Sequence, residues 1–419
     1  MTAISHSNKS QQLGLGTLVL GFLSLLGLIL VVYRWINGLG VTTGLTDGRG
    51  WGIWISFDVL CGIALAAGAF SVAGIVYILR LKEYYPILRP TVLTGFLGYA
   101  LAAFAISVDL GFPHRIYYML YNWNIHSPLF EVGWCVMIYA TVLALEISPI
   151  VFERFNMKAP LKIIRSITIP LVILGIVLST MHQSSLGTLF VLMPHRVHPL
   201  WYSSILPILF FISAMGAGLA MVIVESTWSF FGLKHKLETR LLAKIAKVIP
   251  IILSLYAIGR FIELFISGNN IYLFTGDKYS LLFWVEMLIF VLIPVVLFSL
   301  PSVRRKPMQM FATALLVVFG LLLNRFNVSL VAFSAGAYAP SWIEIFVTIG
   351  MVSIGAFVFT LAARYLAVFP HTTDEKTTVL PEEKKKIGDL EPAYSPVTYT
   401  SKQSIEGKTS TSVPVSRLE

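Results

Sequence analysis

The sequence is divided into long apolar runs, and these runs constrain the fold more than anything else in the chain. A transmembrane helix rises about 1.5 Å per residue and crosses a hydrocarbon core of about 30 Å, so it needs about twenty apolar residues. Only 12% of the residues are charged, whereas soluble domains carry about a quarter. Ten runs reach the required length, near residues 13–35, 52–79, 91–112, 128–152, 162–181, 201–230, 246–266, 281–300, 308–325 and 341–369. The sequence therefore predicts an all-α, polytopic transmembrane helix bundle.

Lysine and arginine are distributed unevenly between the loops on the two sides of this predicted bundle. Fifteen lie in loops on the side of the amino terminus, and five lie in loops on the other side, namely Arg49, Arg115, Arg196, Lys278 and Arg325. Because short basic loops remain in the cytoplasm, we expect both termini to be cytoplasmic. The net charge of +10 is then a signal of membrane topology and does not indicate nucleic acid as a partner.

Composition divides the chain into three parts. Residues 1–12 form a short segment that we expect to be cytoplasmic, and residues 13–369 form the transmembrane helical domain. From residue 370 to residue 419 the apolar runs give way to Ser, Thr, Lys, Glu and Pro. Such a composition cannot bury enough apolar surface to fold, so we predict a disordered cytoplasmic tail.

Several acidic side chains fall inside the predicted spans, where an unpaired charge is costly and often marks a functional site. Asp58, Asp109 and Glu131 fall in the outer halves of their spans and have no obvious partner nearby in the sequence. Glu146 and Glu225 fall toward the inner side. All five are candidates for proton handling, and the alternative for each is a hydrogen-bonded structural carboxyl.

Other charged groups in the outer halves have local explanations. Arg260 and Glu263 are three residues apart on one predicted helix, so they can form an internal ion pair. Glu344 lies close to the beginning of its span, where a carboxylate can stabilise a helix amino terminus. A structural role is therefore favoured for these three residues.

Cysteine and histidine are too sparse for a resident metal centre. Cys61 and Cys135 fall in separate apolar runs, so they cannot hold an iron-sulfur cluster or a structural zinc, and we expect small buried packing residues. Of the histidines, only His182 falls within a predicted helix, at its end. Bis-histidine haem needs imidazoles within facing helices, so we expect no haem. His195 and His198 have no third ligand nearby, so we predict no metal site.

His182 and the outer carboxyls lie on the same side as an aromatic-rich stretch, GFPHRIYYMLYNWNIHSP, at residues 111–128. A quinone requires hydrogen-bond donors for its two carbonyls, groups that supply two protons, and apolar or aromatic walls. This combination favours a quinone site near the outer face, with Arg115 and Tyr117 among the residues that line it. Aromatic belts are also common at membrane interfaces, so the aromatic stretch alone does not identify such a site.

Residues 107–153 and 178–226, including HQSSLG (182–187) and HPLWY (198–202), resemble the NrfD-like family of polysulfide-reductase membrane subunits. The similarity covers residues 13–369 and is strongest to the membrane subunits of periplasmic nickel-iron hydrogenases. The resemblance implies a quinone-interacting subunit of the bacterial inner membrane that has no redox cofactor of its own. It also implies docking, on the periplasmic side, to a ferredoxin-like iron-sulfur subunit and through it to a catalytic subunit. Menaquinone or ubiquinone is the implied substrate.

The resemblance also implies roles for individual residues. It places the quinone pocket at the outer end of the bundle formed by the second to fifth spans. Asp58 on the second span and His182 at the outer end of the fifth are implied to bind the quinone. Asp109 and Glu131, on the third and fourth spans, are implied to handle protons.

Two alternatives remain open from the sequence. Within the same family, the chain could serve a polysulfide, sulfite-related or multihaem-cytochrome complex instead of a hydrogenase. Outside it, ten spans with buried charges are also typical of ion-coupled secondary transporters.

Overall fold

The computed structural model describes residues 14–49, 51–233, 237–334, 338–366 and 368–369. Ten helical segments in this part of the chain are long and apolar enough to cross a membrane. The prediction of an all-α, multi-pass membrane protein is therefore confirmed. The amino-terminal segment and the tail predicted from composition lie outside the described residues.

Several of the ten spans are assembled from consecutive helical pieces. The spans are α1 (Leu15–Asn37), η1–α3–α4–η2 (Trp54–Val59, Leu60–Ala66, Gly68–Ala73, Gly74–Ile78), η3–α5 (Lys82–Tyr84, Tyr85–Asp109), α6 (Pro128–Arg154), α7 (Lys158–Val191), α8 (Leu206–Leu233), α9 (Thr239–Ile266), α10–η6–α11 (Lys278–Met287, Leu288–Leu292, Ile293–Ser299), α13–η7 (Pro307–Phe326, Asn327–Val331) and α14 (Trp342–Tyr365). The connections contain the short helices α2 (Leu39–Thr42), η4 (Pro113–Leu120), η5 (Asn269–Phe274) and α12 (Pro301–Arg305).

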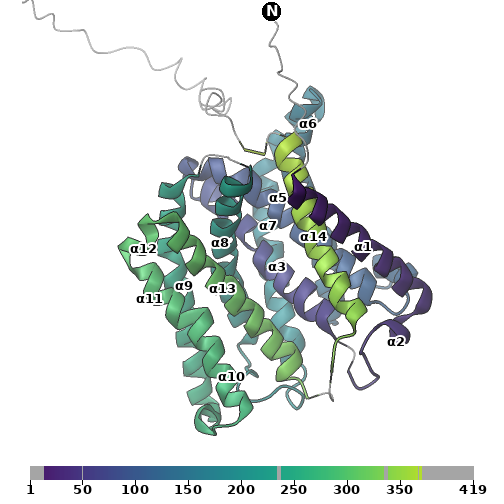
Figure 1. Ribbon diagram of the computed structural model, residues 1–419, viewed down its shortest axis with the longest axis vertical. Helices are drawn as coiled ribbons and strands as arrows, with labels where there is room; N and C mark the ends of the chain where they lie inside the picture. The colour runs from purple at the N-terminus through teal and green to yellow at the C-terminus, as the bar shows by residue number, and fades with distance from the viewer. Residues whose placement is uncertain (1–13, 50, 234–236, 335–337, 367, 370–419) are drawn as a thin grey trace, which may run out of the picture. The chain divides into compact units, whose positions relative to one another are not determined.

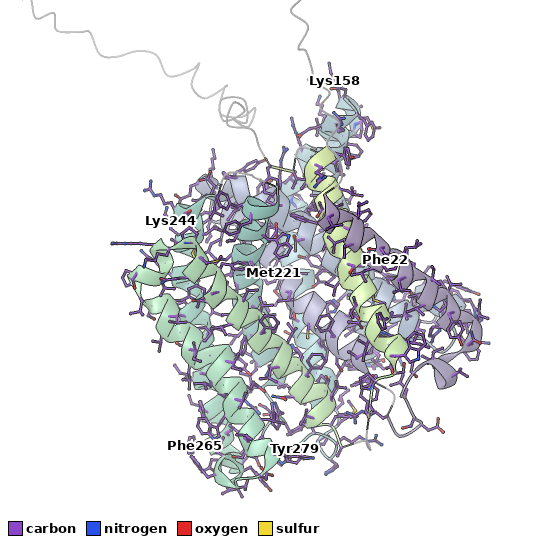
Figure 2. All side chains as sticks on the ribbon, in the orientation of Figure 1. Phe22, Lys158, Met221, Lys244, Phe265 and Tyr279 are labelled. Carbon is purple, nitrogen blue, oxygen red and sulfur yellow. The ribbon has the colours of Figure 1, made fainter. Side chains whose placement is uncertain are left out.

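The two ends of the bundle differ in their connections. Lys158 and Lys244 mark one end in Figure 2, and Phe265 and Tyr279 mark the opposite end. We call the end with Lys158 the basic side, and its connections are short. We call the other end the long-loop side, where residues 38–53, 110–127, 192–205, 267–277 and 332–341 connect the spans. Because the number of described spans is even, α1 begins and α14 ends on the basic side.

The spans form two four-helix groups. The first bundle contains the span 54–78 with α5, α6 and α7, and the second contains α8, α9, the span 278–299 and α13–η7. The groups join where α4 meets α8: a Cβ on Gly68 would lie 2.6 Å from the carbonyl oxygen of Gly218. Small residues permit this close approach of two helices. The remaining two helices, α1 and α14, lie side by side and pack against α5 (Figure 1).

The fifth span is longer than the sequence indicated, and this changes the position of His182. The apolar run ends at residue 181, but α7 continues to Val191. A hydroxyl side chain in the continuation can donate to a carbonyl of its own helix, as Thr188 does to Ser184 (3.1 Å). Polar residues can therefore remain helical inside the bundle. His182 is nine residues from the end of α7, about 13 Å along the helix, and the expectation that it lies at the outer end is wrong.

Candidate functional site

Two carboxyls of the first bundle lie within the outermost turns on the long-loop side, and each accepts a hydrogen bond from another helix. Thr348 of α14 donates its hydroxyl to Oδ2 of Asp58 in η1 at 2.9 Å. Ser185 of α7 donates to Oε1 of Glu131 in α6 at 2.6 Å. Their partners are distant in sequence, so no local pattern indicates them. A π-helical turn such as η1 also occurs frequently at functional sites.

Asp109, at the end of α5, lies beside the charge of Arg34 in α1. The Arg34 side chain is fully buried, and its Nη2 donates to the carbonyl of Leu110 at 2.6 Å. The Oδ1 atom of Asp109 is also buried and has no hydrogen-bond partner. The charge of Arg34 therefore acts on this carboxyl from nearby, and no hydrogen bond or ion pair in the described part of the chain joins the two side chains.

His182 lies at the centre of a buried polar cluster contributed by α5, α6 and α7. Its imidazole meets the ring of Tyr99 edge to face at 5.5 Å, and Tyr99 meets Tyr139 in the same way at 4.5 Å. Ser179 lies close to both tyrosines. Gln183 donates its Nε2 to the carbonyl of Ile63 at 3.0 Å, which ties the cluster to α3. We call these five side chains the His182 cluster.

The His182 cluster contains polar atoms that lack good hydrogen-bond partners. Both ring nitrogens of His182 are buried without a hydrogen-bond partner, whereas the hydroxyls of Tyr99, Tyr139 and Ser179 and Oε1 of Gln183 lie near one another outside good hydrogen-bond geometry. A buried nitrogen without a partner costs about 1–3 kcal/mol, and native interiors rarely contain one. The cluster can therefore bind water or a polar ligand and exchange protons with it.

Glu146 extends this polar region toward the basic side. A Cβ on Gly175 would lie 3.3 Å from the ring of Tyr139 and 3.5 Å from Oε1 of Glu146, so both side chains border the same glycine of α7. On α8, Glu225 is buried beside the side chain of Thr94 of α5. Glu225 thus lies inside the protein, whereas Glu146 is half-buried.

The second bundle contains a buried polar network with a different character. Glu286 in α10 accepts from Trp201 Nε1 (2.8 Å), Asn324 Nδ2 (2.7 Å) and Asn327 Nδ2 (2.8 Å). Arg325 donates to Oδ1 of Asn324 at 2.6 Å and lies 3.7 Å from the centre of the Phe210 ring. Both oxygens of the buried carboxylate are hydrogen-bonded, so Glu286 is satisfied within the protein, and of the Arg325 guanidinium only Nε is buried without a partner among the described residues.

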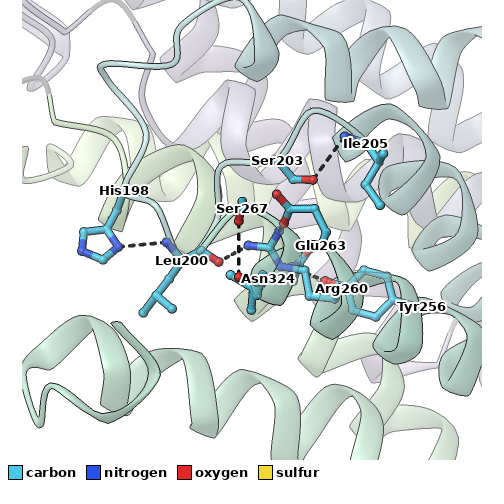
Figure 3. Close-up of polar contacts among 10 residues, drawn as sticks. His198, Leu200, Ser203, Ile205, Tyr256, Arg260, Glu263, Ser267 and Asn324 are labelled. Atoms are coloured by element: carbon cyan, nitrogen blue, oxygen red, sulfur yellow. Dashed lines mark hydrogen bonds and ion pairs between the residues drawn. The ribbon is translucent and has the colours of Figure 1, made fainter. Parts of the chain in front are cut away.

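Figure 3 shows the side of this network formed by α9 and the loop before α8. Arg260 forms an ion pair with Glu263 at 3.2 Å, which confirms the predicted pair, and it also donates to the carbonyl of Leu200. Asn324 donates to the hydroxyl of Tyr256 at 3.1 Å. An adjoining cavity of about 10 Å³ has room for one water at most.

Glu344 and its partners on the long-loop side form structural contacts. Glu344 is fully buried and accepts from the amides of Gly44 (2.7 Å) and Ser341 (2.8 Å), and the latter bond completes a capping box. This confirms its expected role at a helix amino terminus. Burial raises the pKa of Tyr338, whose hydroxyl donates to Glu344 at 2.6 Å. Cys61 and Cys135 are both buried and unpaired, as expected of packing residues.

The predicted quinone-pocket residues are spread over several places. Asp58 contacts α14, whereas His182 contacts α5, and no hydrogen bond or ring contact in the described part of the chain links the two. Arg115 and Tyr117 lie exposed on η4, where Arg115 stacks on the ring of Phe112 at 4.7 Å. The pocket inferred from sequence is thus divided between a shallow carboxyl, a deeper imidazole and a surface helix.

The described residues offer little to a haem or a metal ion. Among them, His182 is the one histidine within a membrane-spanning segment, so bis-histidine haem ligation does not fit these segments. Within the same residues, no three side chains of His, Cys, Asp or Glu form a group that could hold a metal ion.

Comparison with known proteins gives a consistent set of similarities. The model of the family described as "Polysulphide reductase, NrfD" matches residues 42–334. Over 361 residues the chain is 34% identical to the "Probable Ni/Fe-hydrogenase 2 b-type cytochrome subunit" of Escherichia coli, covering 84% of this chain and 92% of that relative. It is 30% identical over 376 residues to the "Menaquinone reductase, integral membrane subunit" of Nitratidesulfovibrio vulgaris, covering 81% and 87%. A further protein of N. vulgaris is 38% identical over 388 residues, covering 89% and 99%.

Proposed function

Because this chain belongs to the polysulphide reductase NrfD family, we propose that it is the quinone-interacting membrane subunit of an electron-transfer complex. One relative is named for menaquinone reduction and another for a nickel-iron hydrogenase. The observation that carries the proposal is the His182 cluster, whose buried imidazole has two unpartnered nitrogens. An unsatisfied imidazole within a membrane span suits a group that donates a hydrogen bond to a quinone carbonyl or to the water beside it.

The proposed reaction is the two-electron reduction of menaquinone or ubiquinone, which takes up two protons to form the quinol. The electrons come from a ferredoxin-like iron-sulfur subunit bound on the long-loop side, and that subunit receives them from a catalytic subunit, most simply a hydrogenase. In this arrangement the long-loop side is periplasmic and the basic side is cytoplasmic, as the distribution of basic residues indicates. The membrane is then the bacterial inner membrane.

The acidic residues and the His182 cluster have separate roles in the proposed proton exchange. Asp58, with His182, contacts the quinone, and Asp109 and Glu131 exchange protons on the long-loop side. The hydrogen bond from Ser185 ties Glu131 to α7, three residues beyond His182. Arg115 and Tyr117 line the entrance used by the quinone, where exposed aromatic rings suit the membrane interface.

Proton supply from the basic side is a further part of the proposal. Glu131 and Glu146 are fifteen residues apart on α6, about 22 Å along the helix, which is too far for direct transfer. Tyr139, Tyr99 and His182 lie between them and belong to one chain of ring contacts. Glu146 and Glu225 would load this chain. Proton uptake from the basic side by proteoliposomes should fall in Glu146→Gln, and unchanged uptake would refute this path.

The decisive test uses the purified complex with a water-soluble menaquinone analogue. His182→Ala and Asp58→Asn should each lower quinone reduction at least tenfold, because each removes a group that contacts the quinone. Dye reduction by the catalytic partner should be preserved. Met181→Leu is the matched control, since Met181 precedes His182 on α7 but is exposed on the lipid side. Wild-type quinone reduction in both variants would overturn the proposed site.

The catalytic partner is tested separately by co-purification from native membranes. A nickel-iron hydrogenase in the isolated complex would support the hydrogenase form of the proposal. A molybdopterin or multihaem subunit in its place would assign the chain to another reductase complex of the same family.

A further inference from the structure

The helices α1 and α14 lie outside the part of the chain that the family model matches, yet they contact the first bundle through polar side chains. The family match covers residues 42–334, whereas α1 ends at Asn37 and α14 begins at Trp342. The two helices pack closely, since a Cβ on Gly27 would lie 2.6 Å from the Cα of Gly350. Figure 1 shows them side by side along one flank.

From this pair, two polar side chains reach the two aspartates near the long-loop side. Thr348 of α14 donates to Asp58 at 2.9 Å, and Arg34 of α1 lies beside Asp109. Neither side chain is directed to lipid, because Thr348 is 7% exposed and Arg34 is fully buried. Two independent helices therefore supply one polar partner each to carboxyls of the first bundle.

Among the described residues, only Thr348 forms a hydrogen bond with the side chain of Asp58. Most other hydroxyls of α14 bond within their own helix: Ser353 donates to Ile349 (2.7 Å) and Thr360 to Ala356 (2.7 Å). Thr348 differs because its hydroxyl turns to another helix. A short side chain with a fixed rotamer holds a carboxyl in one orientation at little entropic cost.

We propose that Thr348 is a positioning residue for the quinone reaction and that the α1–α14 pair completes the site by fixing the Asp58 carboxyl. The inference rests on the proposed function, which assigns Asp58 to the quinone. Thr348 itself does not touch the quinone. Its role is to keep the Asp58 carboxyl in the orientation that proton exchange with the quinone requires.

The experiment compares Thr348→Val with Thr348→Ser in the intact complex. Valine keeps the shape of threonine but lacks the donor, so kcat for quinone reduction should fall about three- to tenfold with little change in KM. Serine keeps the donor and should restore most of kcat. Thr360→Val is the matched control, because it removes from the same helix a hydroxyl bonded only within that helix, and it should retain wild-type kcat.

The double variant separates positioning from general packing. If Thr348 acts through Asp58, Thr348→Val should have no further effect in the Asp58→Asn background. An equal loss in both backgrounds, an equal loss in Val and Ser variants, or wild-type kcat in Thr348→Val would overturn the inference while leaving the proposed function intact. Wild-type kcat in Asp58→Asn would remove Asp58 from the quinone site and defeat the inference with it.

Discussion

The two four-helix bundles place similar side chains at corresponding positions but satisfy them differently. In the first, Tyr99 meets Tyr139 edge to face and lies beside His182; in the second, Tyr256 meets Phe290 edge to face at 5.4 Å and accepts from Asn324. In the first bundle Glu131 accepts a hydrogen bond from Ser185, three residues after His182. In the second, Glu286 accepts one from Asn327, three residues after Asn324.

The two bundles differ in whether their buried polar side chains find hydrogen-bond partners within the protein. In the second bundle Arg325, Trp201 and two asparagines satisfy Glu286 and one another. In the first bundle both ring nitrogens of His182 are buried without a hydrogen-bond partner. An internally satisfied network stabilises a structure, whereas an unsatisfied one leaves atoms for a ligand or a proton. We therefore infer that the polar network of the second bundle stabilises the fold and that the His182 cluster of the first bundle takes part in the reaction.

The largest expected effect is on stability, at the centre of the second bundle. Glu286→Leu removes the acceptor of three donors and leaves Arg325 without a nearby carboxylate. Loss of one partner from a buried charge network costs about 3–5 kcal/mol. Thermal unfolding in detergent should shift strongly downward, and Glu286→Gln, which retains one acceptor oxygen, should fall between Leu and wild type. Wild-type stability in Glu286→Leu would contradict the structural assignment.

His182→Leu should give the opposite pattern. Leucine removes two unpartnered nitrogens and fills similar space, so the free energy of unfolding should stay within about 1 kcal/mol of wild type or increase. Quinone reduction should nevertheless be lost. A destabilisation as large as that of Glu286→Leu would show that the imidazole is a structural group, and the contrast between the bundles would disappear.

A smaller effect is expected at the bond between Ser185 and Glu131. Ser185→Ala removes one hydrogen bond of 2.6 Å, which should lower the free energy of unfolding by about 1 kcal/mol and reduce proton uptake by proteoliposomes severalfold. Ser184→Ala, on the neighbouring residue of α7, serves as control. Equal proton uptake in the two variants would remove Ser185 from the proton route.

The smallest effect concerns a loop between the bundles. His198 stacks on Tyr279 at 4.2 Å and lies near Tyr272, and burial lowers its pKa from 6.5, partly opposed by Asp277. A lowered pKa means that the folded loop favours neutral imidazole, so its stability is complete above pH 6.5 and decreases as the pH falls below that value. The amide protection factors of residues 196–203, corrected for the intrinsic pH dependence of exchange, should therefore be lower at pH 5 than at pH 7. His198→Gln should abolish this pH dependence, and its persistence there would point to another group.

Much of the fold could be predicted from the sequence because the length of an apolar run is a local property. Each of the ten runs was found from consecutive apolar residues, and all ten appear as helices. The predicted fifth run ends at residue 181 because Gln183, Ser184 and Ser185 lower the hydropathy, although a helix can satisfy hydroxyl groups itself, as it does at Thr188. The Arg260–Glu263 pair and the capping role of Glu344 were also predictable, since their partners lie three residues away.

The candidate site was only partly readable. The acidic residues and His182 were identifiable as polar groups within apolar spans, and these residues remain the basis of the proposal. Tyr99, Tyr139 and Ser179 gave no signal, because tyrosine and serine are common in apolar helices. The partners Thr348 and Arg34 were likewise unmarked in the sequence.

The sequence by itself determined the number and order of the spans, because burying a backbone in hydrocarbon requires a helix wherever an apolar run is long enough. The tertiary structure alone decided which carboxyl meets which partner. Asp58 and Thr348 are separated by 290 positions, and a contact over that distance depends on how helices pack, which no local pattern encodes. The same packing satisfied Glu286 in one bundle and left His182 without a hydrogen-bond partner in the other.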